Sequence, residues 1–568
     1  MNQKALPKGW RWTRLVDLVE MFDSGVWGDD LTDQDRGIPV IRVADINENN
    51  QILIDRAPCR RIHQPLLQTK LLHEGDILIV KSSGSHSKII SGRPAFVTGE
   101  MHQRCTFSNF LFRLRPKTNK IHPFYLFAFL TTSAVAEFVR SIVGTTTYPN
   151  IKPRDYVQLS IPLAPLPVQE RIVQILQKAD EIRRKRKEAL ELADKILPAL
   201  FLEMFGDPAT NPKGWPTEPI GTLVHFDTAQ IKPKPGETYL YLAPEHIESN
   251  TGNYTGPHPT DGREIGSAKH PFTSEHVLYC KLRPYLNKVV LPHTSGICST
   301  ELVPLRPGPK LLREFLGIYL RLPFFVATAV QKSQGTKMPR FGPELMKREG
   351  MIVPPIPLQQ SFCLQVSQLM EVSKRVNEGL SLSCSSFNGL LSRAFTGELT
   401  AEWEAANAEW IAGRQAFYER LPRLVILALL AEKAKRAGRA AATVLITALM
   451  KYVFLFQMEG NGGRRRLYHF VPYHYGPFAK ELYTDLGKLQ EEGLVQVESN
   501  PEEDKMKITL TDQVMTEALL AELPEDLKED AATVISTYGD LDHNSLLEVV
   551  YEKYPAYAKK SRLRQRRA

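Results

Sequence analysis

Two long stretches of the chain place apolar residues at alternating spacings of three and four, which is the period of an amphipathic helix. Each stretch spans roughly 38 residues, or about 57 Å of unbroken helix. The first begins near residue 168 and carries its apolar stripe on Ile172, Ile175, Ala179, Ile182, Ala189, Ala193, Ile196 and Leu200. The second begins near residue 358 and carries its stripe on Val366, Leu369, Val376, Leu380, Phe387 and Leu391.

Two helices of equal length in one chain, each with one apolar seam, favour an antiparallel coiled coil formed by the two helices with each other. Two alternatives stay open at this stage. Each seam can instead pack on its own globular domain, or the helices can pair between two chains. Pro198 is expected to kink the last turns of the first helix, because proline cannot donate the backbone hydrogen bond of a helix interior.

Shorter patterns precede each helix. The apolar runs 40–43, 76–80 and 110–114 are broken by Gly, Pro and Asn, which predicts β-strands with turns between them. One helix is predicted from Pro123 to Arg140, where apolar residues again follow helical spacing. This part of the chain is therefore expected to be a mixed α+β domain.

The whole pattern occurs twice. In the first copy a polar segment begins at Gly144, continues through several prolines into the first long helix and ends at Gly206. In the second copy the corresponding segment begins at Gly335 and ends at Gly397. The offsets agree, since 335 − 144 = 191 and 397 − 206 = 191. Pro-Lys-Gly-Trp also occurs twice, from residues 7 and 212, but 212 − 7 = 205, so the first halves differ by insertions. The chain contains a duplicated module.

Composition narrows the class of protein. A chain of 568 residues is expected to hold several domains, and its six cysteines show no zinc-finger or disulfide spacing. Residues 401 to 568 carry 23 Lys plus Arg and 25 Asp plus Glu, a balance of −2, so the net charge of +9 leaves +11 on residues 1 to 400. A basic excess on the duplicated part suits a polyanion such as nucleic acid, although it can also serve solubility alone. No membrane segment or signal peptide is recognisable, which predicts a cytoplasmic protein.

The common catalytic signatures are absent from the sequence. There is no phosphate-binding loop, no His-Glu-x-x-His, no nucleophile elbow, no cofactor loop of Phe-x-Gly-x-Gly type and no methyltransferase tetrapeptide. His469 and His474 are interpreted as packed aromatic residues because no third metal ligand lies nearby. The chain is therefore predicted to bind, without a catalytic or metal site of its own. A self-contained DNA-modifying or DNA-cleaving enzyme with an unrecognised active site stays as the alternative.

Polar, cationic loops recur at equivalent positions in the two copies. Such loops suit phosphate contacts together with hydrogen bonds to base edges, and a solvated hairpin loop is the plainer alternative for each loop alone. In the first copy the predicted DNA-binding residues are Lys81, Ser82, Ser83, Ser85, His86, Lys88, Thr145, Thr146, Thr147, Tyr148, Asn150 and Lys152. In the second copy they are Lys281, Arg283, Tyr285, Asn287, Lys288, Thr336, Lys337 and Arg340.

The region beyond residue 403 has a different pattern. A helix near 444–458 is followed by an amphipathic helix on Phe478, Leu482, Leu486 and Leu489 and by two strand-like runs, 493–497 and 506–510. This order resembles a winged helix. Arg464 to Arg466 favour contact with DNA, but the acidic residues 502–504 at the expected wing tip would repel phosphates, which favours protein docking. The basic tail 559–567 is expected to be disordered and to add non-specific attraction to DNA.

The combination of motifs resembles the specificity (S) subunits of type I restriction-modification systems. The resemblance rests on Pro165-Leu-Pro-Val-Gln-Glu-Arg-Ile172, its thinner copy Pro355-Ile-Pro-Leu-Gln-Gln360, and the Pro-Lys-Gly-Trp motifs. The helix ends Phe201-Leu-Glu-Met-Phe-Gly-Asp207 and Leu391-Ser-Arg-Ala-Phe-Thr-Gly-Glu-Leu-Thr400 are also similar. The second copy departs from the family pattern at Gln360 and Ser361, where the first has Glu170 and Arg171. The surfaces of the two helices on which partner subunits would dock are therefore not expected to bind equally strongly.

The resemblance implies an α+β fold with two α/β target recognition domains, two long antiparallel coiled-coil helices and a mostly α winged-helix-like C-terminal domain. The implied boundaries are 1–160 and 208–353 for the target recognition domains, 161–207 and 354–403 for the helices, and 404–568 for the C-terminal domain. Each recognition domain would read half of a bipartite site in double-stranded DNA, with the helices setting the gap.

The resemblance also implies partners that this chain lacks. Two modification (methyltransferase) subunits carrying S-adenosylmethionine would dock on the helices, and motor-nuclease restriction subunits using ATP and Mg²⁺ would join them. No cofactor is expected in this chain. A winged-helix transcriptional regulator with a coiled-coil scaffold is a further alternative, and it differs by placing all DNA contacts beyond residue 400.

Overall fold

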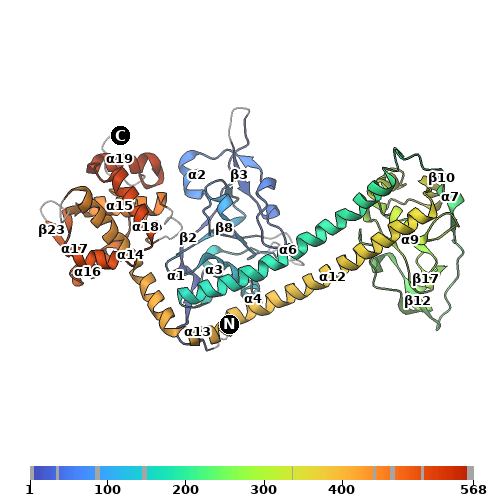
Figure 1. Ribbon diagram of the computed structural model, residues 1–568, viewed down its shortest axis with the longest axis horizontal. Coiled ribbons are helices and arrows are strands. Elements are labelled where there is room, and N and C mark those ends of the chain that lie inside the picture. The colour runs from blue at the N-terminus through green and yellow to red at the C-terminus, as the bar shows by residue number, and fades with distance from the viewer. Residues whose placement is uncertain are drawn as a thin grey trace. The chain divides into compact units, whose positions relative to one another are not determined.

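The fold is α+β, with two α/β regions joined by long helices (Figure 1). The computed structural model describes residues 5–32, 37–82, 90–143, 150–335, 337–438, 443–460, 467–500 and 505–558. The chain divides into two compact units, one of residues 1–180 together with 386–568 and one of residues 181–385. Each unit therefore contains one α/β region and one end of each long helix.

The first α/β region contains three small sheets. β1 (Arg11–Arg14) pairs antiparallel with β9 (Ser160–Leu163), which closes the region. A four-stranded sheet has the order β2 (Val19–Ser24), β8 (Leu111–Pro116), β5 (Ile77–Val80) and β6 (Pro94–Phe96). A three-stranded sheet has the order β4 (Cys59–Arg60), β3 (Ile38–Ile41) and β7 (Thr106–Phe107), with β3 and β7 parallel. The predicted strands 76–80 and 110–114 are confirmed as β5 and β8.

The second α/β region repeats this topology. β10 (Thr217–Pro219) pairs with β19 (Gly350–Ile352) as β1 pairs with β9. The four-stranded sheet has the order β11 (Val224–Phe226), β18 (Leu302–Pro307), β15 (Val277–Cys280) and β16 (Val289–Val290). The other sheet has the order β13 (His258–Asp261), β12 (Thr238–Leu242), β17 (Gly296–Cys298) and β14 (His270–Phe272), again with one parallel pair. The duplication predicted from the sequence is confirmed in the strand order.

The single helix predicted from Pro123 to Arg140 is wrong in one respect. The structure has two helices, α3 (Pro123–Leu130) and α4 (Ser133–Ile142), with axes 68° apart. The hydroxyl groups of Thr131 and Thr132 donate to the carbonyls of Ala128 and Phe129, at 2.7 and 2.8 Å. Thr132 itself is extended, at φ −72° and ψ 155°. Threonine side chains that bond to the local backbone compete with helix continuation, and this explains the break.

The long helices are α6 (Leu166–Phe205) and α12 (Ile356–Ala394), and α6 is continuous through Pro198. Their buried residues lie at the ends. In the first unit Ile172 and Leu176 of α6 share a core with Leu391 and Ala394 of α12. In the second unit the equivalent core contains Phe201 and Phe205 of α6 and Phe362 and Val366 of α12. Within each unit the two helices therefore run antiparallel, and each domain core is completed by both helices.

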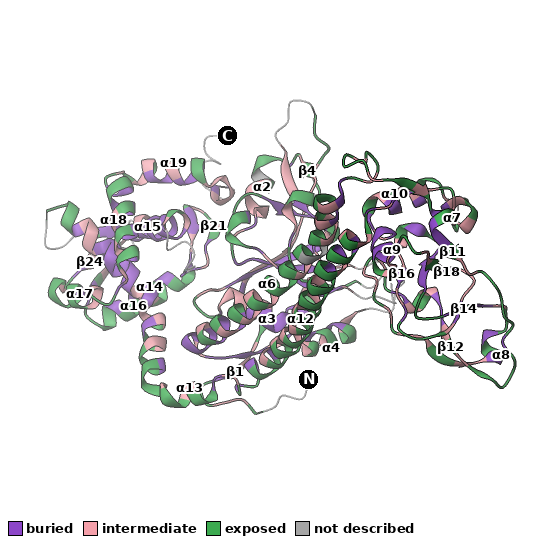
Figure 2. Cartoon of the chain, turned by 45° about the vertical axis from the view of Figure 1, so that its right-hand side comes forward, coloured by how far each residue is buried: buried purple, intermediate pink, exposed green. Residues whose placement is uncertain are grey.

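The middle of the helix pair is exposed, as the green ribbon in Figure 2 shows. Ile182 and Ile196, which the sequence placed on the seam of α6, are 44% and 48% exposed. Val372 of α12 is 55% exposed. The predicted seam is thus buried at its two ends, where the domain cores cover it, and open between them.

Two buried glutamines fix the start of the long helices in the same way. Gln169 in α6 and Gln359 in α12 are both 0% exposed. The Oε1 atom of Gln169 accepts the backbone N–H of His122 at 2.8 Å, and that of Gln359 accepts the N–H of Leu312 at 2.9 Å. Their Nε2 groups donate to carbonyl oxygens of Lys120 and Ala164 in the first domain and Lys310 and Pro354 in the second. A buried amide must satisfy all its polar atoms, which explains why both copies use glutamine here.

His122 makes the first domain sensitive to acid, whereas the second domain has Leu312 at this position. His122 Nδ1 accepts the N–H of Phe124 at the start of α3, and burial lowers the pKa of His122 from 6.5 to about 4. The unfolded chain therefore takes up a proton before the folded chain does, and stability is lost as the pH falls from 6.5 through about 4. In His122→Leu we expect this loss to shrink. Hydrogen exchange of α3 and β5 at pH 7 and pH 5 measures this loss of stability. An equal loss in the wild-type chain and in His122→Leu would show that His122 does not cause it.

Each long helix is followed by a glycine that lies against a Pro-Lys-Gly-Trp motif, Gly206 directly after α6 and Gly397 three residues after α12. Gly206 and Gly397 have φ values of +78° and +82°, which favour glycine. A Cβ atom on Gly206 would lie 2.7 Å from Pro212 Cγ, and one on Gly397 would lie 2.2 Å from Pro7 Cγ. The end of the second helix therefore packs on the start of the chain as the end of the first packs on the following segment.

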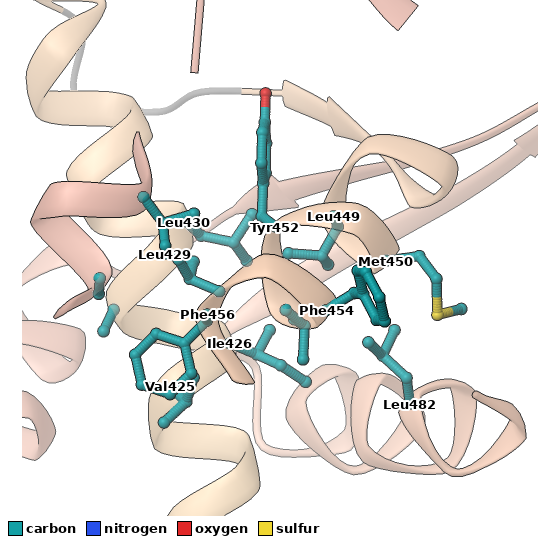
Figure 3. Packing of buried hydrophobic residues seen from close by; sticks show 14 of the residues in the cluster. Val425, Ile426, Leu429, Leu430, Leu449, Met450, Tyr452, Phe454, Phe456 and Leu482 are labelled. Carbon is teal, nitrogen blue, oxygen red and sulfur yellow. The ribbon is translucent and has the colours of Figure 1, made fainter. Parts of the chain in front are cut away.

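The C-terminal region is mostly helical and has its own core, formed around α14 and α15 (Figure 3). Val425 and Ile426 of α14 pack with Phe454 and Phe456 of α15 and with Leu482 of α16. Its helices are α13 (Ala401–Ala406), α14 (Ala408–Arg436), α15 (Ile446–Glu459), α16 (Lys480–Glu491), α17 (Gln513–Leu520), α18 (Glu525–Tyr538) and α19 (His543–Lys553). Its strands are β20 (Thr443–Leu445), β21 (Val471–Tyr473), β22 (Gly476–Phe478), β23 (Val495–Asn500) and β24 (Lys505–Leu510).

The predicted helix at 444–458 is confirmed as α15, and the amphipathic helix as α16, although Phe478 lies in β22. β23 and β24 form an antiparallel pair, with β20 on the other side of β24. The residues Arg464–Arg466, Glu502–Asp504 and the tail 559–567 lie outside the described residues.

The start of α6 is covered by the segment that leads into the C-terminal region. Gln415 of α14 accepts the backbone N–H of Leu166 at 2.9 Å, and the Tyr418 hydroxyl donates to Glu170. Arg171 lies over the ring of Trp403, 5.9 Å from its centroid. These contacts use Glu170 and Arg171, the two residues that the second copy replaces.

Candidate nucleic-acid interface

The two candidate loops of the first domain lie side by side. Lys81 and Ser82 follow β5, and Asn150 and Lys152 precede the short helix α5 (Pro153–Tyr156). Ser82 and Asn150 form an antiparallel bridge, and the N–H of Ile151 donates to the carbonyl of Lys81 at 2.9 Å. Two segments about seventy residues apart in sequence are thus brought to one place, with Asn150 and Lys152 exposed.

The second domain brings its loops together on the same frame. Leu282 bridges Arg340 as Ser82 bridges Asn150. The N–H of Phe341 donates to the carbonyl of Lys281 at 2.9 Å, the counterpart of the bond between Ile151 and Lys81. The backbone arrangement is therefore shared by the two domains, and the side chains on it differ.

Several predicted residues lie outside the part of the chain that the structure describes. In the first domain these are Ser83, Ser85, His86, Lys88, Thr145, Thr146, Thr147 and Tyr148. In the second domain the same holds for Thr336. Their role in DNA binding stays a prediction.

Among the described residues of the second loop, some face solvent and some hold the loop. Arg283 and Tyr285 are exposed, as is Lys337. By contrast, Asn287 Nδ2 donates to the carbonyl of Arg321 at 3.1 Å, and Lys288 Nζ donates to the carbonyl of Pro244 at 2.7 Å. These two bonds give Asn287 and Lys288 a structural role in addition to the predicted one.

Arg340 is held by a carboxylate. Its Nη2 donates to Glu301 Oε1 at 2.9 Å, and this hydrogen bond to the carboxylate raises the pKa of Arg340. The Arg340 side chain is 41% exposed and the Glu301 side chain 24%. The guanidinium is thus fixed in direction while remaining accessible.

The first domain has a cavity of about 520 Å³ beside its candidate loops, which sequence reasoning missed. It combines aromatic and polar side chains, and Ser82 is the one lining residue that was predicted. Its lining residues include Trp27, Arg42, Ser82, Ser108, Asn109 and Phe110. The internal repeat could have pointed to the lining residues 108–110. Ser108-Asn-Phe-Leu111 aligns with Ser299-Thr-Glu-Leu302 at the same offset of 191 that relates the two copies.

The described residues contain no group of three or more His, Cys, Asp or Glu that could hold a metal ion. Among them no single helix is long and apolar enough to cross a membrane; only the bent pair α3 and α4 passes by length and composition together. Both helices of that pair contribute to the buried core of the first domain.

Comparison with known proteins gives matches to one family. Residues 7–192 match the family model of the type I restriction modification DNA specificity domain. The StySPI specificity subunit of Salmonella potsdam is 23% identical over 478 residues, which cover 77% of this chain and 98% of that protein. The chain is similar to the type I specificity subunits, and its residues 7–192 carry the match to their DNA specificity domain. Such subunits direct a methylase and restriction complex to its DNA target and are non-catalytic.

Two further proteins resemble this chain, one over a shorter part of its length and one at lower sequence identity. The EcoDI specificity subunit of Escherichia coli is 31% identical over 207 residues, so the match spans 36% of this chain and less than half, 45%, of that relative. The solved HsdS subunit of Thermoanaerobacter tengcongensis is 19% identical, with a TM-score of 0.31 over 70% of this chain and 99% of that one.

Proposed function

We propose that each α/β domain of this specificity subunit reads one half of a bipartite sequence in double-stranded DNA, and that α6 and α12 set the gap between the halves. The observation that carries the proposal is the shared backbone frame at residues 81–82 with 150–152 and at 281–282 with 340–341, which presents different side chains in the two domains. Two related readers of different sequences need that combination. The charge of +11 on residues 1 to 400 supports contact with phosphates.

The exposed middle of the helix pair supports the docking of partner subunits. Within the second unit a groove of about 620 Å³ lies between α6 and α12, lined by apolar residues such as Ile182 and Val372 and by Arg186 and Arg375. Exposed apolar surface of this kind marks interaction sites. In this proposal two modification subunits carrying S-adenosylmethionine bind along the helices, and motor-nuclease subunits using ATP and Mg²⁺ complete the complex.

The C-terminal region is proposed to be a winged-helix-like module that docks on protein. Its helix and hairpin order, α16 followed by β23 and β24, agrees with that fold. The contacts of Gln415 and Tyr418 with the start of α6 support a docking role, because they already connect this region to the first domain. DNA recognition is thereby assigned to the two α/β domains.

The test is to express the chain together with its modification subunit in a host without DNA methylation and to map the methylated bases. We expect one motif of two defined parts separated by a fixed number of undefined bases. Seven residues added to the exposed middle of both α6 and α12 lengthen each helix by about 10.5 Å, which is about three base pairs. The gap should then change while both defined parts stay the same. A continuous motif, or no motif, would refute the proposal.

The same assay tests the C-terminal assignment. A chain with Gln415→Ala and Tyr418→Phe should keep both halves of the motif, because these side chains contact α6 and the proposal places base reading in the two α/β domains. A change of the recognised bases in this variant would show instead that the C-terminal region reads DNA.

A further inference from the structure

The turn that follows β7 and its counterpart after β17 are built alike. The N–H of Ser108 donates to the carbonyl of Ile41, and the N–H of Ser299 donates to the carbonyl of Leu242, both at 2.9 Å. The third residue of each turn, Phe110 or Glu301, accepts the N–H of the lysine at the start of the candidate loop, again at 2.9 Å. These segments, the 108–110 turn and the 299–301 turn, therefore lie directly against the loops that are proposed to contact DNA.

In the first domain the 108–110 turn presents a buried hydroxyl without a partner among the described residues and an exposed aromatic ring. Ser108 is 1% exposed, lines the cavity, and its Oγ has no hydrogen-bond partner among the described residues. Phe110 is 58% exposed and Trp27 is 38% exposed, with Arg60 over the Trp27 ring at 4.7 Å. A buried hydroxyl without a hydrogen-bond partner costs free energy, and so does an aromatic ring exposed to water. A ligand with a polar and an apolar edge would pair with the hydroxyl and cover the ring.

Asn109 stands between these two residues and is exposed. An asparagine amide pairs with N6 and N7 of adenine in the major groove, and an aromatic side chain contacts the methyl group of thymine. A single A·T base pair offers both edges together. The 520 Å³ of the cavity is ample for one base edge and its neighbours.

In the second domain the equivalent position presents a different combination. Glu301 binds Arg340 through Nε at 3.2 Å and through Nη2 at 2.9 Å, and Nη1 donates to the carbonyl of Met338 at 3.3 Å. Arginine has five N–H donors, so the guanidinium keeps donors beyond those used by Glu301 and Met338. A guanidinium held in this way suits bidentate hydrogen bonds to O6 and N7 of guanine.

We propose that the 108–110 turn reads an A·T base pair of the first half-site through Asn109 and Phe110, and that Arg340, held by Glu301, reads a guanine of the second half-site. This inference rests on the proposed function and adds the base class and the residues that read it. Phe110 and Glu301 are related by the internal repeat, so the same turn contacts the base pair directly in the first domain and holds the reading Arg340 in the second.

The test uses the full chain in complex with its modification subunit, and measures binding to a library of duplexes together with the methylated motif. Asn109→Ala and Phe110→Ala should reduce the preference for an A·T pair at one position of the first part by roughly 5- to 150-fold and leave the second part unchanged. Arg340→Lys, which keeps the charge beside Glu301 but loses the fork, should reduce the preference for guanine in the second part alone by a similar factor. Each variant is the control for the other domain.

The outcomes separate this inference from the proposed function. A wild-type motif that is not bipartite overturns the proposed function and the inference with it. A bipartite motif whose base preferences do not change in these variants overturns the inference alone. Weaker binding to all duplexes by the same factor also overturns it, because that result indicates phosphate contact and not base reading.

Discussion

Replacing Asp76 by alanine is expected to destabilise the first α/β domain by about 3–5 kcal/mol. Asp76 is 1% exposed and accepts both Nε and Nη2 of Arg115, at 2.7 and 2.6 Å. Arg113, 0% exposed, lies 4.0 Å from the same carboxylate, and burial lowers the pKa of Arg113 to about 10. Without Asp76 the guanidinium groups of Arg113 and Arg115 stay buried. They lose a large part of the electrostatic attraction that offsets the free-energy cost of burying their charges. Hydrogen exchange of β5 and β8 in the full chain measures the loss.

The second domain supplies the control for this prediction. Its corresponding cluster is smaller, with Asp227 between His276 and Arg306 at 2.9 Å each, and the Asp227 side chain is 36% exposed. Solvent screens charges at such a site, so Asp227→Ala is expected to cost about 1 kcal/mol or less. Equal losses in the two domains would contradict the argument, because burial would then not decide the effect.

Phe205→Ala is expected to destabilise the second α/β domain by about 3–5 kcal/mol, although Phe205 belongs to the helix that starts in the first domain. The ring is 1% exposed and lies 4.9, 5.3 and 5.2 Å from the rings of Phe201, Phe315 and Phe362. Its removal leaves a cavity in a core that both long helices share. Denaturation followed by hydrogen exchange of β15 and β18 measures the effect.

Leu192→Ala on the same helix is the matched control. Leu192 is 60% exposed, so the substitution is expected to change the free energy of unfolding by less than about 0.5 kcal/mol. A loss at Leu192 as large as that at Phe205 would show that the middle of the helix is a packed seam in the isolated chain. A loss that emerges at Leu192 only after the modification subunit binds would instead support docking at this surface.

The long helices show what the spacing of apolar residues can predict and what it cannot. A spacing of three and four identifies a helix and its apolar stripe from local sequence, and both helices formed within a few residues of the predicted bounds. The period does not identify what covers the stripe. Ile172 is buried in a domain core, but Ile182 and Ile196 on the same stripe are largely exposed, because a partner surface is present only where a domain core meets the helix.

The candidate site was predictable to a different degree. Lys81 and Lys281 were found because they recur after equivalent strands, and their cationic side chains are a property of the sequence itself. Phe110 and Glu301 were missed because they lie at the end of a turn that is distant in sequence from the loops. Only the pairing of β5 with β8 and of β15 with β18 brings those turns against Lys81 and Lys281.

The sequence by itself determined the duplication, the two long helices, the basic excess of the duplicated part and the family that these features resemble. Each of these depends on local spacing or on charge, which a chain carries before it folds. The tertiary structure decided which ends of the helices complete which domain core, which glutamines and carboxylates are buried, and which turns stand beside the candidate loops. Those properties arise from contacts between residues about 40 to 250 positions apart, and no local pattern encodes them.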